Sequence, residues 1–460
     1  MGIPTFRQYA KYVFKKTLIS NVSGIVSTKS IKKALWKSLV FVACIIGFFY
    51  QTGDFLNLYF TYPTIVNVEE SNPFEVVLPA ITICSNNRFS RQVSCEKHGN
   101  WCTFYENDDF CETYSRFCNT PNNYYKKIPQ NVFKQFEENN KSWDVADELF
   151  PKQPIIRECR MGTSIKSYEC NGLSHTNQQM KIPFLSVDNK PSYCYVIASQ
   201  LHQPDSQEEI YPNSLYYDIK LNTYAEDYFF IDSPVVLYIA VHNRKDLVNP
   251  FRKGVTLKGG HGYRAFVSMA EVERLPYPYS TNCTDYIKLW RENGGKGPLT
   301  QVECIEYCKL NFIKSIGECV DEHISYSHLE ELCATGHETI TYDIIKDCFK
   351  QCQPACVENS YEVTYEELEL DSQNCTLKME GCRLQEVDIK FSFRQFQLTR
   401  QVFQPKFDSI EVFSYVGGYM GIWLGISLVS IFDVLESIMM LLCFWIRTKK
   451  RRKKLNIKYA

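Results

Sequence analysis

The sequence predicts a membrane protein with two transmembrane helices and a large, disulfide-rich α+β domain on the extracellular side. Two long apolar stretches lie near the two ends of the 460-residue chain, and a basic cluster flanks each of them on its outer side. Eighteen of the twenty cysteines lie between the two stretches. Because Lys and Arg concentrate on the cytosolic side of membrane helices, both termini are predicted to be cytosolic.

The charge distribution supports the same orientation. Residues 1–37 carry eight Lys or Arg and no acid, and residues 447–460 carry eight more and no acid. The region between the spans has a surplus of about fourteen negative charges, although the net charge of the chain is only -1. Basic ends can bind nucleic acid, but each of these abuts an apolar stretch. The lipid bilayer is therefore the predicted partner, and no nucleic acid is expected.

The first predicted span covers residues 34–56 and follows a cytosolic leader, residues 1–33. It is long enough to cross a hydrocarbon core of about 30 Å. Its centre, Leu39–Tyr50, is apolar without interruption, and polar residues such as Gln51 lie toward its ends. A buried core helix is the alternative. No cleavable signal peptide is apparent, so this span is expected to act as an uncleaved signal anchor.

The second predicted span covers residues 411–446 and precedes a basic cytosolic tail, residues 447–460. As one straight helix it would be about 50 Å long, which exceeds a bilayer core. It must therefore project beyond the membrane, tilt or be interrupted. The glycine-rich stretch Gly417–Ser427 is the expected place for an interruption, which is a feature of pores and transporters.

The domain between the spans, residues 57–410, is predicted to be α+β. Alternating and apolar runs predict strands, and cysteine-containing amphipathic runs predict helices. The predicted strands include Val76–Cys84 and Val235–His242, the predicted helices include Thr300–Phe312 and Ile344–Cys356, and residues 119–150 are predicted to form a surface insertion.

Eighteen cysteines in this domain predict up to nine disulfides, because such a number is typical of an oxidising, extracellular environment. Their connectivity does not follow from the sequence. Some are spaced as CxxxC, which could indicate zinc, but the oxidising exterior favours disulfides, so no metal site and no cofactor are predicted. The eighteen are Cys84, Cys95, Cys102, Cys111, Cys118, Cys159, Cys170, Cys194, Cys283, Cys304, Cys308, Cys319, Cys333, Cys348, Cys352, Cys356, Cys375 and Cys382. Three glycosylation acceptors, Asn140, Asn282 and Asn374, agree with an extracellular location.

Polar groups inside the second span indicate an ion pathway. Gly425, Ile426 and Ser427 permit an extended turn whose carbonyl and hydroxyl oxygens can face a dehydrated cation. Asp433 and Glu436 follow, and an unpaired carboxylate in the middle of a bilayer costs about 3 kcal/mol or more. They therefore need a water-filled lumen or partners. The alternative is that they pair with juxtamembrane lysines, and glycines at this spacing also occur in non-conducting helix dimers.

The stretch GGYMGIWLGISLVSIFDVLE resembles the second membrane segment of epithelial sodium channels, degenerins and acid-sensing channels. LPAITICSNNRFSR (Leu78–Arg91) and RLPYPYSTNCTDY (Arg274–Tyr286) are similar to further motifs of this family. The resemblance covers nearly the whole chain. It implies a trimeric channel whose extracellular domain has palm and β-ball sheets with a helical finger and thumb.

The resemblance also implies roles for individual residues. The selectivity filter corresponds to Gly425, Ile426 and Ser427, the outer-pore position that contacts amiloride corresponds to Gly421, and the degenerin gating position corresponds to Ser414. The cysteines from Cys283 to Cys356 look like the disulfide ladder of the thumb, and Tyr62 and Tyr279 correspond to the wrist. In the leader, the family's His-Gly gating pair is Ser23-Gly24 here, so only Gly24 is retained and gating is put in doubt.

The function expected from this resemblance is that of a subunit of a sodium-selective, amiloride-sensitive cation channel in the plasma membrane. Its expected partners are sodium ions, identical or homologous subunits, and a peptide or protons as extracellular ligand. The palm histidine of acid-sensing members is missing from Tyr59–Pro63, so proton sensing would need carboxylate pairs. A non-conducting accessory subunit or two-span surface receptor is the alternative. An ATP-gated receptor is disfavoured by the acidic domain, and no HExxH or GxSxG motif indicates an enzyme.

Overall fold

A computed structural model of the chain describes most of its residues. The described residues are 8–10, 12–13, 30–104, 108–117, 127–130, 141–163, 167–169, 180–203, 205–333, 340–369, 384–393 and 396–458. They form two compact units. The helical unit consists of Met1–Ile65, Pro278–Ser280 and Gln404–Ala460, and the large unit consists of Val66–Tyr277 and Thr281–Phe403.

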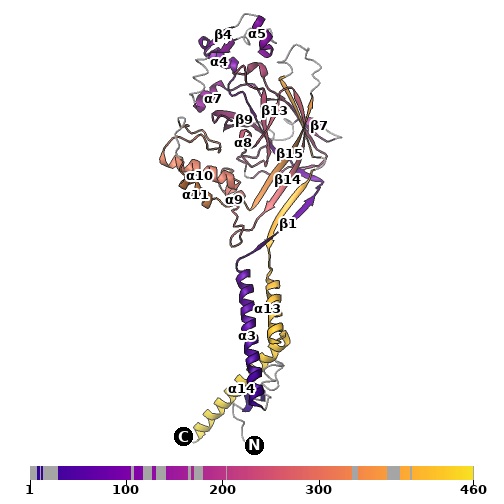
Figure 1. Ribbon diagram of the computed structural model, residues 1–460, viewed down its shortest axis with the longest axis vertical. Helices are drawn as coiled ribbons and strands as arrows, with labels where there is room; N and C mark the ends of the chain where they lie inside the picture. Colours follow the sequence, from indigo (N-terminus) through magenta and orange to yellow (C-terminus); the bar gives the residue numbers. More distant parts are fainter. Residues whose placement is uncertain are drawn as a thin grey trace. The chain divides into compact units, whose positions relative to one another are not determined.

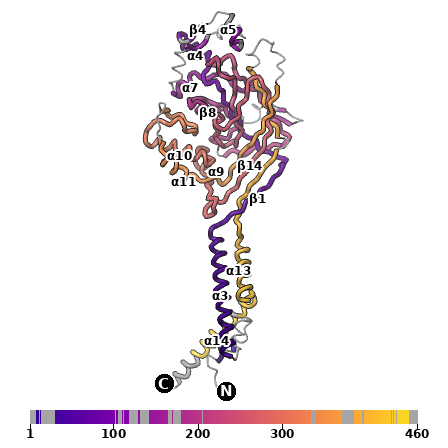
Figure 2. The backbone as a smooth tube through the Cα atoms, viewed as in Figure 1, coloured from indigo at the N-terminus to yellow at the C-terminus, as the bar shows by residue number. Residues whose placement is uncertain are grey.

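The helical unit contains three long helices, α3 (Ile31–Tyr59), α13 (Ser409–Leu424) and α14 (Leu428–Lys458). Figure 2 shows α3 and α13 running side by side. Within the described part of the chain, α3 is the one helix that is long and apolar enough to cross a membrane. It includes all of the predicted span 34–56.

The second predicted span is divided between two helices. The helix α13 begins after Asp408, whose backbone N–H donates to Glu411 Oε2 at 3.2 Å, as in a capping box. It ends at Leu424, and α14 begins at Leu428. Of the three ways in which residues 411–446 could fit a bilayer, the structure therefore shows an interruption, and it lies at Gly425–Ser427.

The large unit is built around an eight-stranded mixed sheet with the order β1-β17-β14-β16-β11-β6-β7. The long strand β14 pairs with β15 along one edge, and with β16 and then β17 along the other. The strands are β1 (Thr64–Ser71), β6 (Ile156–Gly162), β7 (Ser167–Glu169), β11 (Tyr216–Asn222), β14 (His261–Glu273), β15 (Val357–Glu369), β16 (Glu386–Ser392) and β17 (Leu398–Pro405).

A second, five-stranded sheet has the order β13-β12-β3-β9-β8. Its strands are β3 (Ala80–Ser85), β8 (Met180–Leu185), β9 (Pro191–Ile197), β12 (Val236–His242) and β13 (Val255–Lys258). Two short pairs complete the described strands, and they are β2 (Glu75–Val77) with β10 (Ile210–Pro212) and β4 (Cys102–Phe104) with β5 (Lys127–Pro129).

The main apolar core contains side chains from both sheets. Alternate residues of β11, such as Tyr217 and Ile219, point into this core, and every residue of β3 is buried. Ile83 of β3 and Phe391 of β16 belong to the same cluster and are fully buried. Alternating burial in β11 and continuous burial in β3 are the patterns expected of a half-covered and a fully covered sheet.

The large unit also contains helices and 3-10 turns, and Figure 1 shows α10 and α11 side by side. They are α4 (Arg91–Lys97), η1 (Gly99–Trp101), α5 (Asp108–Thr113), η2 (Ser115–Phe117), α7 (Trp143–Leu149), η6 (Ala225–Asp227), α8 (Pro250–Lys253), α9 (Tyr286–Glu292), α10 (Gln301–Ile316) and α11 (Tyr342–Gln351).

Three predicted segments differ from the structure. The expected strand Val76–Cys84 is two strands, because Pro79 lacks a backbone N–H for the ladder and separates β2 from β3. The expected helix Ile344–Cys356 ends at Gln351. The predicted surface insertion was wrong at its C-terminal end, because α7 buries Trp143 and Leu149 in an apolar cluster.

Candidate functional site

The candidate site is the interruption between α13 and α14. Gly425 has φ +63°, a left-handed conformation that glycine adopts without strain and that commonly ends helices. Its N–H donates to the carbonyl of Gly421 at 3.1 Å. The backbone therefore leaves the helix at Gly425, which is the position that the glycine-x-serine pattern predicts.

Ser427 lies at the other end of the interruption, directly before α14. Its Oγ accepts the backbone N–H of Ser430 at 3.3 Å, and the two hydroxyl oxygens lie 3.0 Å apart. Ser427 thus caps the first turn of α14, as serine typically does. Ile426 is the remaining residue of the triplet, and its N–H donates to the carbonyl of Met420 at 3.5 Å, as at the end of a helix.

Two acids follow on α14, and they differ in exposure. Ser430, Asp433 and Ser437 are spaced to share one helical face, on which both serines are buried and Asp433 is half-buried. Glu436 lies at the edge of this face and is exposed. The structure therefore places the predicted pore acids on one side of α14, together with the serine hydroxyls.

Gly421 and Ser414 both lie on α13. A Cβ added to Gly421 would have no heavy atom within 4 Å in the described chain, and the same holds for Gly417. Ser414 is exposed, and its Oγ donates to the carbonyl of Ile410 at 2.9 Å. At Gly417 and Gly421, α13 therefore has no side chain beyond Cα, and no other part of the described chain packs against it there.

An interaction that sequence reasoning missed joins α13 to α3. Trp423 Nε1 donates to Gln51 Oε1 at 2.7 Å. From the sequence, Gln51 is expected only to lie toward the end of the first span. The only available signal was an amide and an indole inside two apolar stretches, which does not identify a pair 372 positions apart.

The two wrist residues of the resemblance lie together in the helical unit. The rings of Tyr62 and Tyr279 meet edge to face, with centroids 5.7 Å apart. The adjacent backbone is tied by a hydrogen bond from the N–H of Lys406 to the carbonyl of Pro63, 2.9 Å long. The segment that follows α3 and the segment that precedes α13 are therefore linked at this level.

Comparison with protein families decides the class of protein. Residues 13–437 match the profile of the amiloride-sensitive sodium channel family. The chain belongs to this family. No curated protein sequence matches it. Among solved structures, a proton-activated chloride channel determined by cryo-electron microscopy shares 7% sequence identity with a TM-score of 0.31, and the match covers 88% of this chain and 96% of that one.

Membership of the amiloride-sensitive sodium channel family makes the protein an ion channel of the plasma membrane rather than an enzyme. Six disulfides between described residues stiffen the large unit of this channel. They are Cys84–Cys194, Cys95–Cys102, Cys283–Cys356, Cys304–Cys352, Cys308–Cys348 and Cys319–Cys333. Two of them join α10 to α11 like rungs, one turn apart.

Cys159 is also disulfide-bonded, whereas Cys44 and Cys443 are free. Several predicted site residues lie outside the described residues. They are Gly24, Asn140, Asn374, Cys118, Cys170, Cys375 and Cys382, together with the side chain of Cys111.

Asn282 is described and exposed, as a glycosylation acceptor must be. The described part of the channel contains no group of three His, Cys, Asp or Glu arranged to hold a metal.

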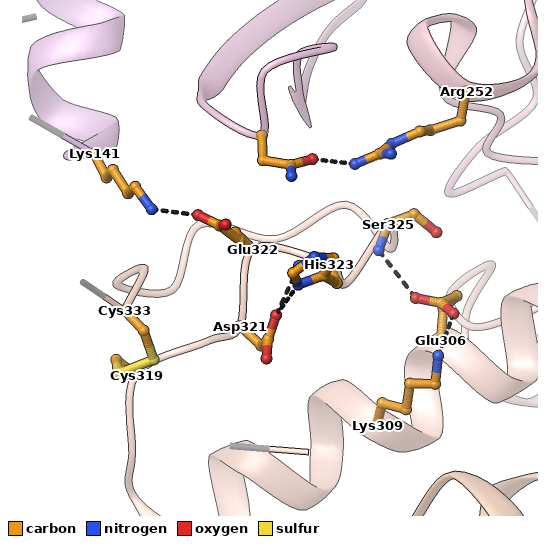
Figure 3. A network of polar contacts seen from close by, with 11 residues as sticks. Lys141, Arg252, Glu306, Lys309, Cys319, Asp321, Glu322, His323, Ser325 and Cys333 are labelled. Carbon is orange, nitrogen blue, oxygen red and sulfur yellow. Dashed lines mark hydrogen bonds and ion pairs between the residues drawn. A yellow bond between two sulfur atoms is a disulfide. The ribbon is translucent and has the colours of Figure 1, made fainter. Parts of the chain in front are cut away.

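The loop closed by Cys319–Cys333 holds several parts of the large unit together (Figure 3). Glu322 in this loop forms an ion pair with Lys141, just before α7. Glu306 of α10 accepts the backbone N–H of Ser325 at 3.0 Å and pairs with Lys309 at 2.7 Å. The loop therefore ties α7 to α10 through polar contacts.

Two carboxyl groups near the start of α10 have perturbed pKa values. Burial raises the pKa of Glu303 to about 6, although its Oε2 accepts the backbone N–H of Leu299 at 2.8 Å. Burial also raises the pKa of Asp246, and the nearby Glu303 and Glu358 raise it further. The pKa values of both carboxyl groups therefore lie above those of ordinary carboxyl groups, and burial is the largest cause.

Proposed function

We propose that this channel protein is the pore-forming subunit of a sodium-selective, amiloride-sensitive cation channel. Three copies, identical or homologous, surround a pore lined by the second membrane span. The proposal keeps the predicted topology, with spans at residues 34–56 and 411–446, an extracellular domain at residues 57–410, and cytosolic ends.

The observation that carries this proposal is the interruption at Gly425–Ser427. A stretch of non-helical backbone at membrane depth is tolerated only where protein or a water-filled cavity satisfies its polar groups. Three copies of this turn would form rings of carbonyl and hydroxyl oxygens, which is how filters replace the hydration shell of an ion. Gly425, Ile426 and Ser427 are therefore the proposed selectivity filter.

The remaining pore residues have proposed roles that follow their positions. Asp433 and Glu436 attract cations to the inner end of the pore, because carboxylates raise the local cation concentration. Gly421 leaves room for amiloride on the outer side of the filter. Ser414 is the proposed degenerin gating position, and Gly24 is the proposed gating residue of the leader.

The proposed stimulus is an extracellular peptide or protons that act on the large unit. Protons would act on carboxyl groups such as Glu303 and Asp246, whose pKa values are raised by burial. One departure from the family pattern favours a second candidate function. Ser23 replaces the histidine of the leader, so a non-conducting accessory subunit of a heteromeric channel is the alternative.

The deciding experiment is whole-cell current from the chain expressed alone, with external Na⁺ replaced by K⁺, with and without amiloride. The expected result is an amiloride-blocked current whose reversal potential shows preference for Na⁺, and altered selectivity after Gly425→Ala. Gly53→Ala is the matched control, because a Cβ there meets nothing within 4 Å in the described chain. Surface-expressed protein without current under acid, peptide or stretch contradicts the pore and supports the accessory subunit.

The pore acids provide a second test of the same proposal. Neutralising either Asp433 or Glu436 to the amide should reduce single-channel conductance. The reduction should be larger at low ionic strength than at high, because salt screens the field of a carboxylate. Unchanged conductance in both variants would exclude their role in permeation.

A further inference from the structure

The contact between α3 and α13 follows a regular pattern. Each helix contributes three residues spaced by four, which therefore lie on one helical face. These residues are Gly47, Gln51 and Phe55 on α3, and Tyr415, Tyr419 and Trp423 on α13. Phe55 is buried, and its ring centroid lies 4.8 Å from that of Tyr415 and 6.2 Å from that of Tyr419. The outer part of the contact is thus aromatic.

The inner part of the contact is different, because it contains one polar pair. The indole N–H of Trp423 donates to the amide oxygen of Gln51 at 2.7 Å. In hydrocarbon, a polar group without a partner costs several kcal/mol, so this donor and this acceptor satisfy each other. An apolar contact can slide by a turn at small cost, whereas a single polar pair selects one register.

Gly47 lies one turn from Gln51 and makes room for the same indole. A Cβ on Gly47 would lie 2.7 Å from Cζ3 of Trp423 and 2.9 Å from Cε3 and Cη2. Real Cβ atoms do not approach other atoms so closely, so any larger residue at position 47 would displace the ring. Gln51 and Gly47 together form what we call the Trp423 seat. Gln51 accepts the N–H at the edge of the indole ring, and Gly47 leaves room for its face.

The Trp423 seat lies directly before the interruption of the second span. Trp423 is one residue before Leu424, the last residue of α13, and Gly425–Ser427 lie between the two helices, held at their ends by cap hydrogen bonds. We propose that Gln51 and Gly47 are positioning residues for ion selectivity. By holding Trp423 they set the depth and rotation of the end of α13, and thereby the placement of Gly425–Ser427. This inference rests on the proposed pore function.

The first test measures the ratio of Na⁺ to K⁺ permeability from reversal potentials. Gln51→Leu leaves the indole N–H without its acceptor and should lower the ratio by about threefold, the size of one hydrogen bond between membrane helices. Gly47→Ala should lower it as well, whereas Gly53→Ala, on the same helix with open space around it, should not. A normal ratio in both seat variants at normal surface expression overturns the proposal.

A rescue variant separates positioning from general damage to the fold. Gln51→Leu combined with Trp423→Phe removes both polar groups, so that neither is left without a hydrogen-bond partner. The double variant should therefore recover most of the selectivity that Gln51→Leu loses, and Gly47→Ala should have little effect in a Trp423→Leu background. If the losses of selectivity are additive in both combinations, the proposed role of the Trp423 seat is contradicted.

A third measurement does not depend on current. Ile426→Cys is labelled with a maleimide on intact cells in a background with Cys44→Ser and Cys443→Ser, and the rate is compared with and without Gln51→Leu. A rate change of about threefold or more is expected, because the triplet moves when Trp423 is released. If the wild type passes no current but this rate changes, the pore function fails and the seat remains. An unchanged rate overturns the seat whatever the current shows.

Discussion

The hydroxyl oxygens of Ser427 and Ser430 lie 3.0 Å apart, and Ser427 Oγ also accepts the backbone N–H of Ser430. Ser427 therefore has two tasks in the proposed channel. It contributes to the filter, and it caps the first turn of α14. These tasks make different demands on the side chain, so substitutions can separate them.

Ser427→Ala removes both the cap and the hydroxyl, and should cost about 1 kcal/mol in the stability of the first turn of α14. It should also alter the ratio of Na⁺ to K⁺ permeability. Ser427→Thr keeps a capping oxygen and should retain expression and current better than alanine does. Ser430→Ala is the matched control, because its backbone N–H can still donate to Ser427. Equal effects of Ser427→Ala and Ser430→Ala on selectivity would mean that the hydroxyl of Ser427 has no special role.

The two disulfides that link α10 to the region of α11 allow a prediction about stability. Replacing Cys308 and Cys348 with serine removes a bridge that closes 40 residues. Bridges over loops of this size typically contribute about 2–4 kcal/mol, mainly by restricting the unfolded chain. The double variant should therefore unfold at a lower temperature in a thermal shift assay on the purified channel. Cys443→Ser, which changes a free cysteine, is the control and should leave the midpoint unchanged.

Much of this architecture could be predicted because it depends on local patterns. The interruption at Gly425 follows from glycine's access to positive φ next to a capping serine, both of which are visible within three residues. The helix around Cys304 and Cys308 follows from spacing along one face. The pairing of these cysteines with Cys352 and Cys348 could not be derived from spacing, because it depends on how α10 and α11 pack.

The features that could not be predicted are long-range. Gln51 looks like a residue at a membrane interface until Trp423 is placed beside it. Trp143 lies in a polar stretch that reads as surface, and its burial depends on the distant loop closed by Cys319–Cys333, where its Nε1 donates to the carbonyl of Glu330 at 3.0 Å. Arg244 has no local signal either, yet its side chain is 2% exposed and donates through Nε to the carbonyl of Ala198 at 2.7 Å.

His328 predicts a loss of stability in acid. It is buried against the indole of Trp143, with ring centroids 5.8 Å apart, and neither ring nitrogen has a hydrogen-bond partner among the described residues. Burial lowers its pKa from 6.5 to about 4, although the charge of the nearby Glu330 opposes this shift and Lys314 reinforces it. The folded state therefore resists protonation, and the contribution of His328 to stability is lost as the pH falls from 6.5 to 4.

His328→Phe keeps an aromatic ring and removes the titration. The decrease in the free energy of unfolding between pH 7 and pH 4 should become smaller by on the order of 3 kcal/mol. Denaturant unfolding of the purified channel at several pH values measures this. His242 is the comparison site, because its ring is buried but bonded, with Nε2 2.7 Å from Thr82 Oγ1. An unchanged acid sensitivity in His328→Phe would show that the ring is already hydrated.

Glu303 predicts a pH dependence of the opposite sign. Its pKa is raised by burial from 4.5 to about 6, so in this window the folded state binds a proton more readily than the unfolded state does. Its contribution therefore increases stability as the pH falls from 6 to 4.5, and this gain is absent above pH 6. The charged groups that act on Glu303 or on the nearby Asp246 are Glu358, Lys245 and Lys253.

Glu303→Gln should remove this pH-dependent contribution to stability while keeping an oxygen that can accept the N–H of Leu299. The variant should be more stable than the wild type at pH 7.5, and the two should converge as the pH approaches 4.5. If the carboxyl also senses protons for gating, the same variant should shift the pH that half-activates an acid-evoked current. Glu306→Gln, on the same helix and in an ion pair with Lys309, is the matched control. A constant stability difference between Glu303→Gln and the wild type from pH 7.5 to pH 4.5 would mean that Glu303 titrates in its ordinary range and is no proton sensor.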